Sequence, residues 1–196
     1  MGNNNFQRDT TKEPFVHLNG LNWTTENYAG ETFSNGDPIR VVTSVEEWVE
    51  ANKKGEPACA SYEFNSSNDN LFGKFYNGYA VKDERGIGED GFRLPTKEEY
   101  GALQKFLIKN KMEIYSETAW QQVTDLFVPS GFDALPTGFM DKDGSFAEAG
   151  INGYLWTATV YDGYNSHAYM IYPSSRKFFM YHYMWDMGMP VRLIKD

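Results

Sequence analysis

Glycine turns divide the last third of the sequence into short aromatic and β-branched segments, and this pattern limits the fold more than any other. The turn pairs are Ser130-Gly131, Asp143-Gly144, Asn152-Gly153 and Asp162-Gly163. The segments among and after them are residues 154–160, 167–172, 177–183 and 191–194. Asn-Gly and Asp-Gly pairs favour hairpin turns, and segments of this composition favour strands. We therefore expect short antiparallel strands and hairpins in this part of the chain.

Capping residues predict two helices earlier in the chain. The first begins after Ser44, with Glu47 three residues later, and ends where two lysines are followed by Gly55. The second begins after Thr96, with Glu99 three residues later. A hydroxyl residue followed at this spacing by Glu is the signature of a capping box, and a glycine after cations is typical of a helix end.

Apolar stripes support a second and a third helix. The stripe of the second helix is Tyr100, Leu103, Phe106 and Leu107, and that of a third, at residues 116–127, is Trp120, Val123 and Phe127. Stripes at this spacing are expected to pack into the core. Helices before strands predict an α+β fold, although a short strand is also expected within residues 15–24. The length of 196 residues favours one domain, residues 15–196, after a polar tail of residues 1–14.

Charge and composition exclude several classes of function. The net charge is −9 and there is one cysteine, Cys59. An acidic chain lacks the basic surface that nucleic acid or anionic lipid requires. One cysteine cannot build a disulfide framework, and His17, His167 and His182 are too scattered to predict a metal site. No segment approaches the apolar length of a membrane span, and the N-terminus has no signal-peptide pattern.

Catalytic motifs are also missing from the sequence. It has no nucleophile elbow, P-loop or zinc-protease motif, and the acidic pairs Glu46/Glu47 and Glu98/Glu99 lie where helix dipoles explain them. We expect no enzymatic activity and no cofactor. Asp141 and Asp143 have the spacing that begins a calcium loop, but the downstream Glu is missing. A hairpin turn is the favoured interpretation, and calcium binding is left open.

Aromatic residues make up 16% of the chain and concentrate in the segment 176–189. Alternate residues of a strand face opposite sides, so one of the sets Phe178/Met180/His182 and Phe179/Tyr181/Tyr183 is expected in the core and the other on the surface. Aromatic and Met side chains are typical of binding surfaces. The predicted ligand-binding residues are Tyr161, Tyr164, Phe179, Tyr181, Tyr183 and Trp185. The alternative is ordinary core packing against Tyr161, Tyr164 and Tyr172.

Many short blocks carry a family resemblance from about residue 21 to the end of the chain. They include Asn22-Trp23-Thr24-Thr25-Glu26-Asn27, Gly73-Lys74-Phe75-Tyr76-Asn77-Gly78-Tyr79, Gly91-Phe92-Arg93-Leu94-Pro95-Thr96, Tyr154-Leu155-Trp156-Thr157-Ala158-Thr159 and Gly188-Met189-Pro190-Val191-Arg192-Leu193. In this order they resemble the Fibrobacter succinogenes major paralogous domain, a relative of the formylglycine-generating-enzyme and C-type-lectin-like folds. Gly78 departs from the pattern, since that position commonly holds an aromatic residue, and so do Cys59 and Ala60.

The resemblance implies a C-type-lectin-like α+β fold with two or three short helices and several short antiparallel strands. It also implies that residues 15–18 and 191–194 lie close together. The formylglycine-generating relatives use paired cysteines that hold copper, which a chain with one cysteine cannot provide. Other relatives, the variable proteins of diversity-generating retroelements, vary side chains on a surface formed by the C-terminal part of the domain.

These observations predict a non-catalytic adhesin or receptor-binding domain that recognises a protein or glycan through its C-terminal aromatic surface. Retroelement diversification of that surface is left open. The alternative is a structural or receptor-binding component of a phage tail or another surface assembly, acting as a homo-oligomer or within a larger complex. An enzyme of unknown type is the remote alternative. The expected location is extracellular, on a bacterial surface or a phage virion.

Overall fold

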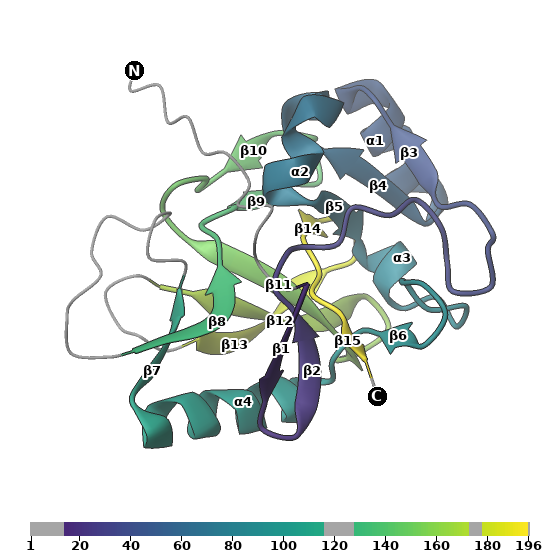
Figure 1. The fold of residues 1–196 in the computed structure, drawn as a ribbon. Coiled ribbons are helices and arrows are strands. Elements are labelled where there is room, and N and C mark those ends of the chain that lie inside the picture. Colours follow the sequence, from purple (N-terminus) through teal and green to yellow (C-terminus); the bar gives the residue numbers. More distant parts are fainter. Residues whose placement is uncertain (1–13, 116–127, 173–177, 196) are drawn as a thin grey trace.

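Strands and helices alternate along the computed structural model, which describes residues 14–115, 128–172 and 178–195 (Figure 1). The helices of this part are α1 (Val45–Lys54), α2 (Asp69–Phe72), α3 (Gly78–Val81) and α4 (Lys97–Asn110), with 3-10 turns at Tyr62–Phe64 and Ser66–Asn68. The α+β class is confirmed. The expected two or three helices are wrong, because the described ranges contain four α-helices. The expected order of helices before strands holds in part: only strands follow α4 in the described ranges, but six strands precede it. The helix predicted at residues 116–127 lies outside the described residues.

Local capping interactions explain where the two longer helices begin and end. At α4, Thr96 Oγ1 accepts a hydrogen bond from Glu99 N at 3.2 Å, and Glu99 Oε2 accepts one from Thr96 N at 2.7 Å, which completes the predicted capping box. At α1, Ser44 Oγ accepts from Glu47 N, but the Glu47 carboxylate accepts from Thr43 N instead of closing the box. Gly55 ends α1 in a left-handed conformation with φ of 66°, which glycine adopts without steric cost.

The described strands form four sheets. The first has the order β1 (Phe15–Leu18), β2 (Leu21–Thr24), β15 (Ile194–Lys195) and β6 (Phe92–Arg93). The second has the order β10 (Phe146–Ala147), β9 (Phe139–Met140), β14 (Gly188–Met189), β5 (Lys74–Asn77), β4 (Ala58–Ser61) and β3 (Arg40–Val42). The third is β11 (Gly153–Val160), β12 (Asn165–Ile171) and β13 (Phe178–Met184), and the fourth is β7 (Met112–Tyr115) with β8 (Val128–Ala134). The β3–β4 and β7–β8 pairs are parallel, unlike the antiparallel pairs that the turn pattern predicts.

The N-terminal hairpin and the last strand lie side by side, as expected. Ile194 pairs with Trp23, and β2 separates β15 from β1 (Figure 1). The strand predicted at residues 191–194 is shorter, however, because only its end joins a ladder. Arg192, two residues before this strand, is fully buried. Its guanidinium donates to Asn27 Oδ1 and to the backbone carbonyls of Thr24, Phe132 and Asp133, at 2.7 to 3.0 Å.

Two apolar clusters cover opposite faces of the three-stranded sheet. On one face, Leu155 and Tyr169 pack with Tyr100 and Leu103 of α4. On the other face lies a second cluster, whose members from this sheet are Tyr154, Trp156, Ala168 and Met170. A third cluster joins Trp48 of α1 to Phe75 and Met140. The central strand β12 and the first five residues of β11 are thus buried on both faces, while β13 is covered mainly at its first residue.

The segment with calcium-like spacing forms the turn between β9 and β10. Asp143 Oδ1 accepts hydrogen bonds from Ser145 N at 2.9 Å and Ser145 Oγ at 2.6 Å, and Gly144 has a φ of 84°. The hairpin-turn interpretation is confirmed. Within the described ranges, no helix has the length and apolarity to cross a membrane.

Candidate functional site

Strand β13 exposes large apolar side chains on both of its faces. Phe178 is buried, but Phe179, Met180, Tyr181 and Met184 each expose between 39% and 45% of their surface. Among the described strands β13 pairs only with β12, in an unbroken register from Phe178 to Met184. The expectation that one alternating set packs in the core is therefore wrong. The cause is that β13 lies at the edge of its sheet, so most of the strand extends beyond both apolar clusters.

One face of β13 carries three of the six predicted residues: Phe179, Tyr181 and Tyr183. The ladder with β12 aligns them with Met170, Ala168 and Ser166. Rings from neighbouring segments extend this group, since Tyr172 lies 5.5 Å from Phe179 and Tyr154 lies 5.9 Å from Tyr183, between ring centroids. We call the group Tyr154, Tyr172, Phe179, Tyr181 and Tyr183 the phenol face.

Burial and hydrogen bonds raise the pKa of three hydroxyl groups of the phenol face, those of Tyr154, Tyr172 and Tyr183. Tyr154 Oη donates to Glu148 Oε2 at 2.5 Å, and this carboxylate also accepts from Asn152 Nδ2. Burial, followed by the Glu148 interaction, raises the pKa of Tyr154, and burial raises the pKa of Tyr183. Burial and a hydrogen bond with Tyr181 raise the pKa of Tyr172. The phenol face therefore presents apolar rings with neutral donors and one carboxylate beside them.

The opposite face of β13 holds a different group, which we call the histidine face: Tyr161, Met180, His182 and Met184. Tyr161 stacks on His182 with ring centroids 4.2 Å apart and an interplanar angle of 10°. His182 pairs across the ladder with His167, which is buried and whose Nδ1 has no hydrogen-bond partner. The predicted residue Tyr161 thus lies on the other side of the sheet from the phenol face.

Trp185 follows β13 and anchors the end of the strand. Its Nε1 donates to Ser166 Oγ at 3.0 Å, and its backbone N donates to the carbonyl of Tyr164. The Lys82 ammonium lies 4.6 Å from the centroid of its ring, a favourable cation–π distance. Trp185 is half-buried, so only part of this side chain is open to a ligand.

Tyr164, 79% exposed, lies in the turn between β11 and β12. The structure therefore divides the six predicted residues among the phenol face, the histidine face, this turn and the Trp185 anchor. Tyr172 and Glu148 also belong to this surface but were not predicted, whereas Tyr154, 3% exposed, supports the phenol face from within the core. The positions of the two tyrosines could be found from the register of β11 and β12 once the hairpin was known, but Glu148 carries no local signal.

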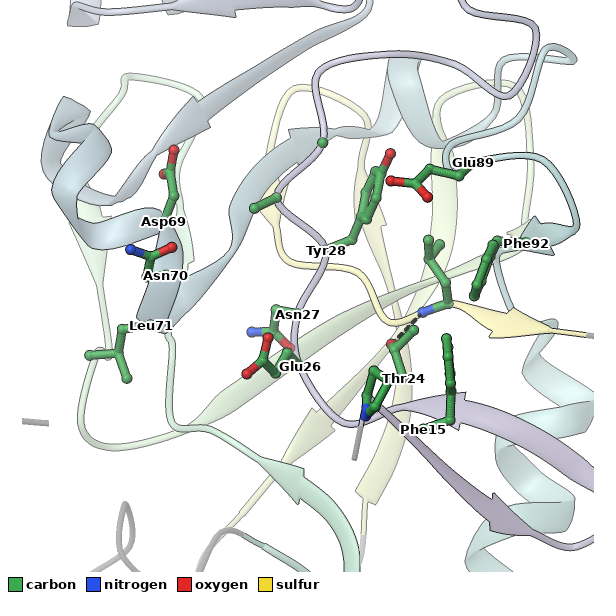
Figure 2. Close-up of a pocket in the computed structure, with 14 residues that line it drawn as sticks. Phe15, Thr24, Glu26, Asn27, Tyr28, Asp69, Asn70, Leu71, Glu89 and Phe92 are labelled. Carbon is green, nitrogen blue, oxygen red and sulfur yellow. Dashed lines mark hydrogen bonds between the residues drawn. The ribbon is translucent and has the colours of Figure 1, made fainter. Parts of the chain in front are cut away.

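A second candidate site is a pocket of about 410 Å³ beside the N-terminal hairpin (Figure 2). It is lined by residues 14–15, 24, 26–30, 69–71, 89, 92 and 193. Glu26, Asp69 and Glu89 are its acidic residues, and Phe15, Tyr28 and Phe92 supply rings. The sequence reasoning missed this pocket, because its lining comes from distant segments that carry no shared motif.

The remaining described residues include one thiol, that of Cys59, and scattered ionisable groups. Within the described ranges, no group of three His, Cys, Asp or Glu side chains is placed to hold a metal ion. Cys59 is fully buried, and burial raises the pKa of its thiol to about 12. Because the thiolate is the reactive form of cysteine, Cys59 has the properties of a core residue.

Comparison with known families gives one match. The model of the Fibrobacter succinogenes major domain matches residues 16–195, which is nearly the whole chain. No curated protein and no solved structure matches the chain significantly.

Proposed function

We propose that this chain, which belongs to the Fibrobacter succinogenes major domain family, is a non-catalytic recognition domain that binds a protein or glycan through the surface of β13. The observation that carries the proposal is the exposure of Phe179, Met180, Tyr181 and Met184 on an edge strand. Residues 178–184 contain no Asp, Glu, Lys or Arg. Proteins normally protect edge strands with charges or proline. An edge without that protection is consistent with a surface that a ligand covers.

The phenol face supplies the chemistry of the proposed contact. Tyr side chains combine large contact area with a polar end and lose little conformational entropy on binding. Of Tyr172, Tyr181 and Tyr183, Tyr181 is the most exposed. The Glu148 carboxylate lies beside Tyr154. Rings with neutral hydroxyls suit either a glycan or a polar protein surface. Met180 and Met184 on the opposite face suit a protein that wraps the edge.

The fold type is part of the proposal. A C-type-lectin-like arrangement is supported by the pairing of β15 with β2 and by the C-terminal position of the exposed strand. Within that arrangement, retroelement diversification would act on β13 and on Trp185. We further propose an extracellular location, on a bacterial surface or a phage virion, where an exposed recognition strand would meet its ligand.

A binding screen tests this function. Wild type and Tyr181→Ala are applied to glycan and protein arrays, with Ile108→Ala as the control because Ile108 is a similarly exposed apolar residue on α4. We expect ligands that bind wild type and Ile108→Ala but lose at least about tenfold in affinity with Tyr181→Ala, as for an aromatic hot spot. Equal binding by all three proteins would contradict the proposal for β13.

The same protein preparation also tests the alternative that the chain is a component of a larger assembly. Solution scattering over a range of concentrations reports whether the chain forms trimers or larger oligomers. A defined oligomer that is lost with Tyr181→Ala would indicate that copies of the chain pair through β13. A monomer at all concentrations would favour recognition of a separate ligand.

A further inference from the structure

We propose that the pocket beside the N-terminal hairpin is a second binding site, and that it accepts a small organic ammonium ion. The pocket lies between α2, the segment after β2, and β6 (Figure 2). Its volume of about 410 Å³ falls in the range of small-molecule sites. It does not include any residue of β13, so this inference is independent of the function proposed above.

Aromatic contacts hold the rings of the pocket in place. Phe15 and Phe92 stack with centroids 5.5 Å apart. Tyr28 stacks on Tyr76 at 6.2 Å, and Tyr76 Oη donates to the carbonyl of Gly30 at 2.7 Å. The Tyr28 ring occupies the space that a Cβ at Gly30 would fill. Fixed aromatic walls favour a ligand with an apolar body, and the faces of such rings attract cations.

The charge of the lining is negative. Glu26, Asp69 and Glu89 line the pocket, while none of the described lining residues is Lys, Arg or His. Figure 2 shows the Glu89 carboxylate beside the Tyr28 ring, and Asp69 across the pocket on α2. Lys195 contacts the Phe92 ring at 5.5 Å but is not part of the lining. An anion would therefore be repelled, and a cation attracted.

The buried Lys74 does not cancel this charge. Its ammonium lies 2.8 Å from Asp69 Oδ2 and 3.1 Å from Glu31 Oε1, so one cation is shared between two carboxylates. The other oxygen of Asp69, Oδ1, is buried and has no hydrogen-bond partner. A buried acceptor without a partner is costly, but because Oδ1 is buried, a ligand would interact with Asp69 through its charge and not through a hydrogen bond to this atom.

The lining thus combines aromatic surface with negative charge. A neutral polyol could use the rings but would gain nothing from the charge. An alkylammonium ion uses both, because its N–H groups can donate to the exposed carboxylate of Glu89 while its chain contacts the rings. This combination is what favours the ammonium class over a sugar.

The test is an NMR titration of the intact chain with two probes of equal size, butylammonium and butan-1-ol. We expect butylammonium to produce saturable shifts of the amide signals of residues 24–30 and 69–71, with butan-1-ol at least about threefold weaker. Added salt should weaken butylammonium binding and leave butan-1-ol unchanged, since exposed charges are screened. Equal effects of the two probes, or no shift of these amides by either, would overturn the proposal.

Two variants test whether the Glu89 carboxylate attracts the ammonium ion. Glu89→Gln removes one carboxylate from the lining, and it should weaken butylammonium binding about two- to fivefold, the range of an exposed ion pair. Glu84→Gln removes the same charge from an exposed position outside the lining, and it should leave binding unchanged. The two spectra without probe report whether each variant keeps the fold. Equal affinity for wild type and Glu89→Gln would place the ammonium elsewhere and refute the assignment.

Discussion

Trp185 lies against Gly78 so closely that a Cβ on this glycine would be 2.5 Å from the Trp185 Cα. The two residues are also joined through the backbone, where Gly78 N donates to the carbonyl of Trp185 at 2.8 Å. The indole of Trp185, which follows β13, also lies against this glycine. The absence of a side chain at position 78 therefore allows the close packing of Trp185.

Gly78→Ala should destabilise the protein. Alanine favours helix over glycine by up to about 1 kcal/mol, but the clash is with backbone atoms of Trp185, which cannot rotate away. Overpacking of this kind costs about 1–3 kcal/mol, so the steric effect exceeds the gain. Urea unfolding measures the free energy. Gly163→Ala is the control, because a Cβ there meets nothing within 4 Å, and it should change stability little or slightly increase it.

Arg192→Met should be among the most destabilising single substitutions. It leaves Asn27 Oδ1, the buried carbonyl of Phe132 and the part-buried carbonyls of Thr24 and Asp133 without this donor. Unsatisfied buried acceptors cost about 1–3 kcal/mol each, so we expect a loss of about 3 kcal/mol or more. Arg40→Met is the control, because Arg40 pairs with Glu50 and Glu56 at the surface, where ion pairs contribute at most about 1 kcal/mol. Similar losses for both variants in denaturant unfolding would contradict this ranking.

Cys59 should be unreactive in the native state. Burial raises the pKa of its thiol to about 12, against the weaker opposing effect of Lys74. Thiol reagents attack the thiolate, so at about pH 8 we expect almost no alkylation without denaturant and one label per chain after unfolding. Mass spectrometry after timed quenching measures the rate. Labelling of the folded chain as fast as of a free thiol would show that β4 opens readily.

The stability of the protein should decline in mild acid through His167. Burial, with contributions from Lys97 and His182, lowers the pKa of His167 below its ordinary value of 6.5, while Glu98 and the Tyr181 backbone oppose the shift. The contribution to stability is therefore complete above the unfolded-state pKa and is lost as the pH falls through the folded-state pKa.

A variant isolates this contribution from the other titrating groups. His167→Gln should show a smaller fall in the free energy of unfolding than wild type when the pH is lowered below 6.5. Parallel pH profiles of the two proteins in urea unfolding would mean that His167 does not carry the effect.

Local interactions account for the parts of the fold that could be predicted from the sequence. The ends of α1 and the start of α4 depend on Ser44, Gly55, Thr96 and Glu99, all within one turn of the helix that they cap. The strands β11, β12 and β13 also follow from their own composition, and the Asp162-Gly163 turn separates the first two.

The remaining features depend on contacts between distant segments. Arg192 has the sequence pattern of a strand residue that faces outward. Its guanidinium instead donates to the carbonyls of Phe132 and Thr24, in segments about 60 and 168 residues away. The strands β9, β10 and β14 are two residues long and form only through their partners. The edge position of β13 likewise follows from the sheet order, which is why β13 exposes side chains on two separate faces.

This division makes β13 a convenient target for combinatorial mutagenesis. Randomising Phe179, Tyr181 and Tyr183 would remodel one side of the strand, and randomising Met180, His182 and Met184 would remodel the other. The uninterrupted ladder with β12 provides the same backbone support to both libraries. Selections from the two libraries could therefore yield binders for unrelated targets, and chosen halves could be combined afterwards in one bispecific scaffold.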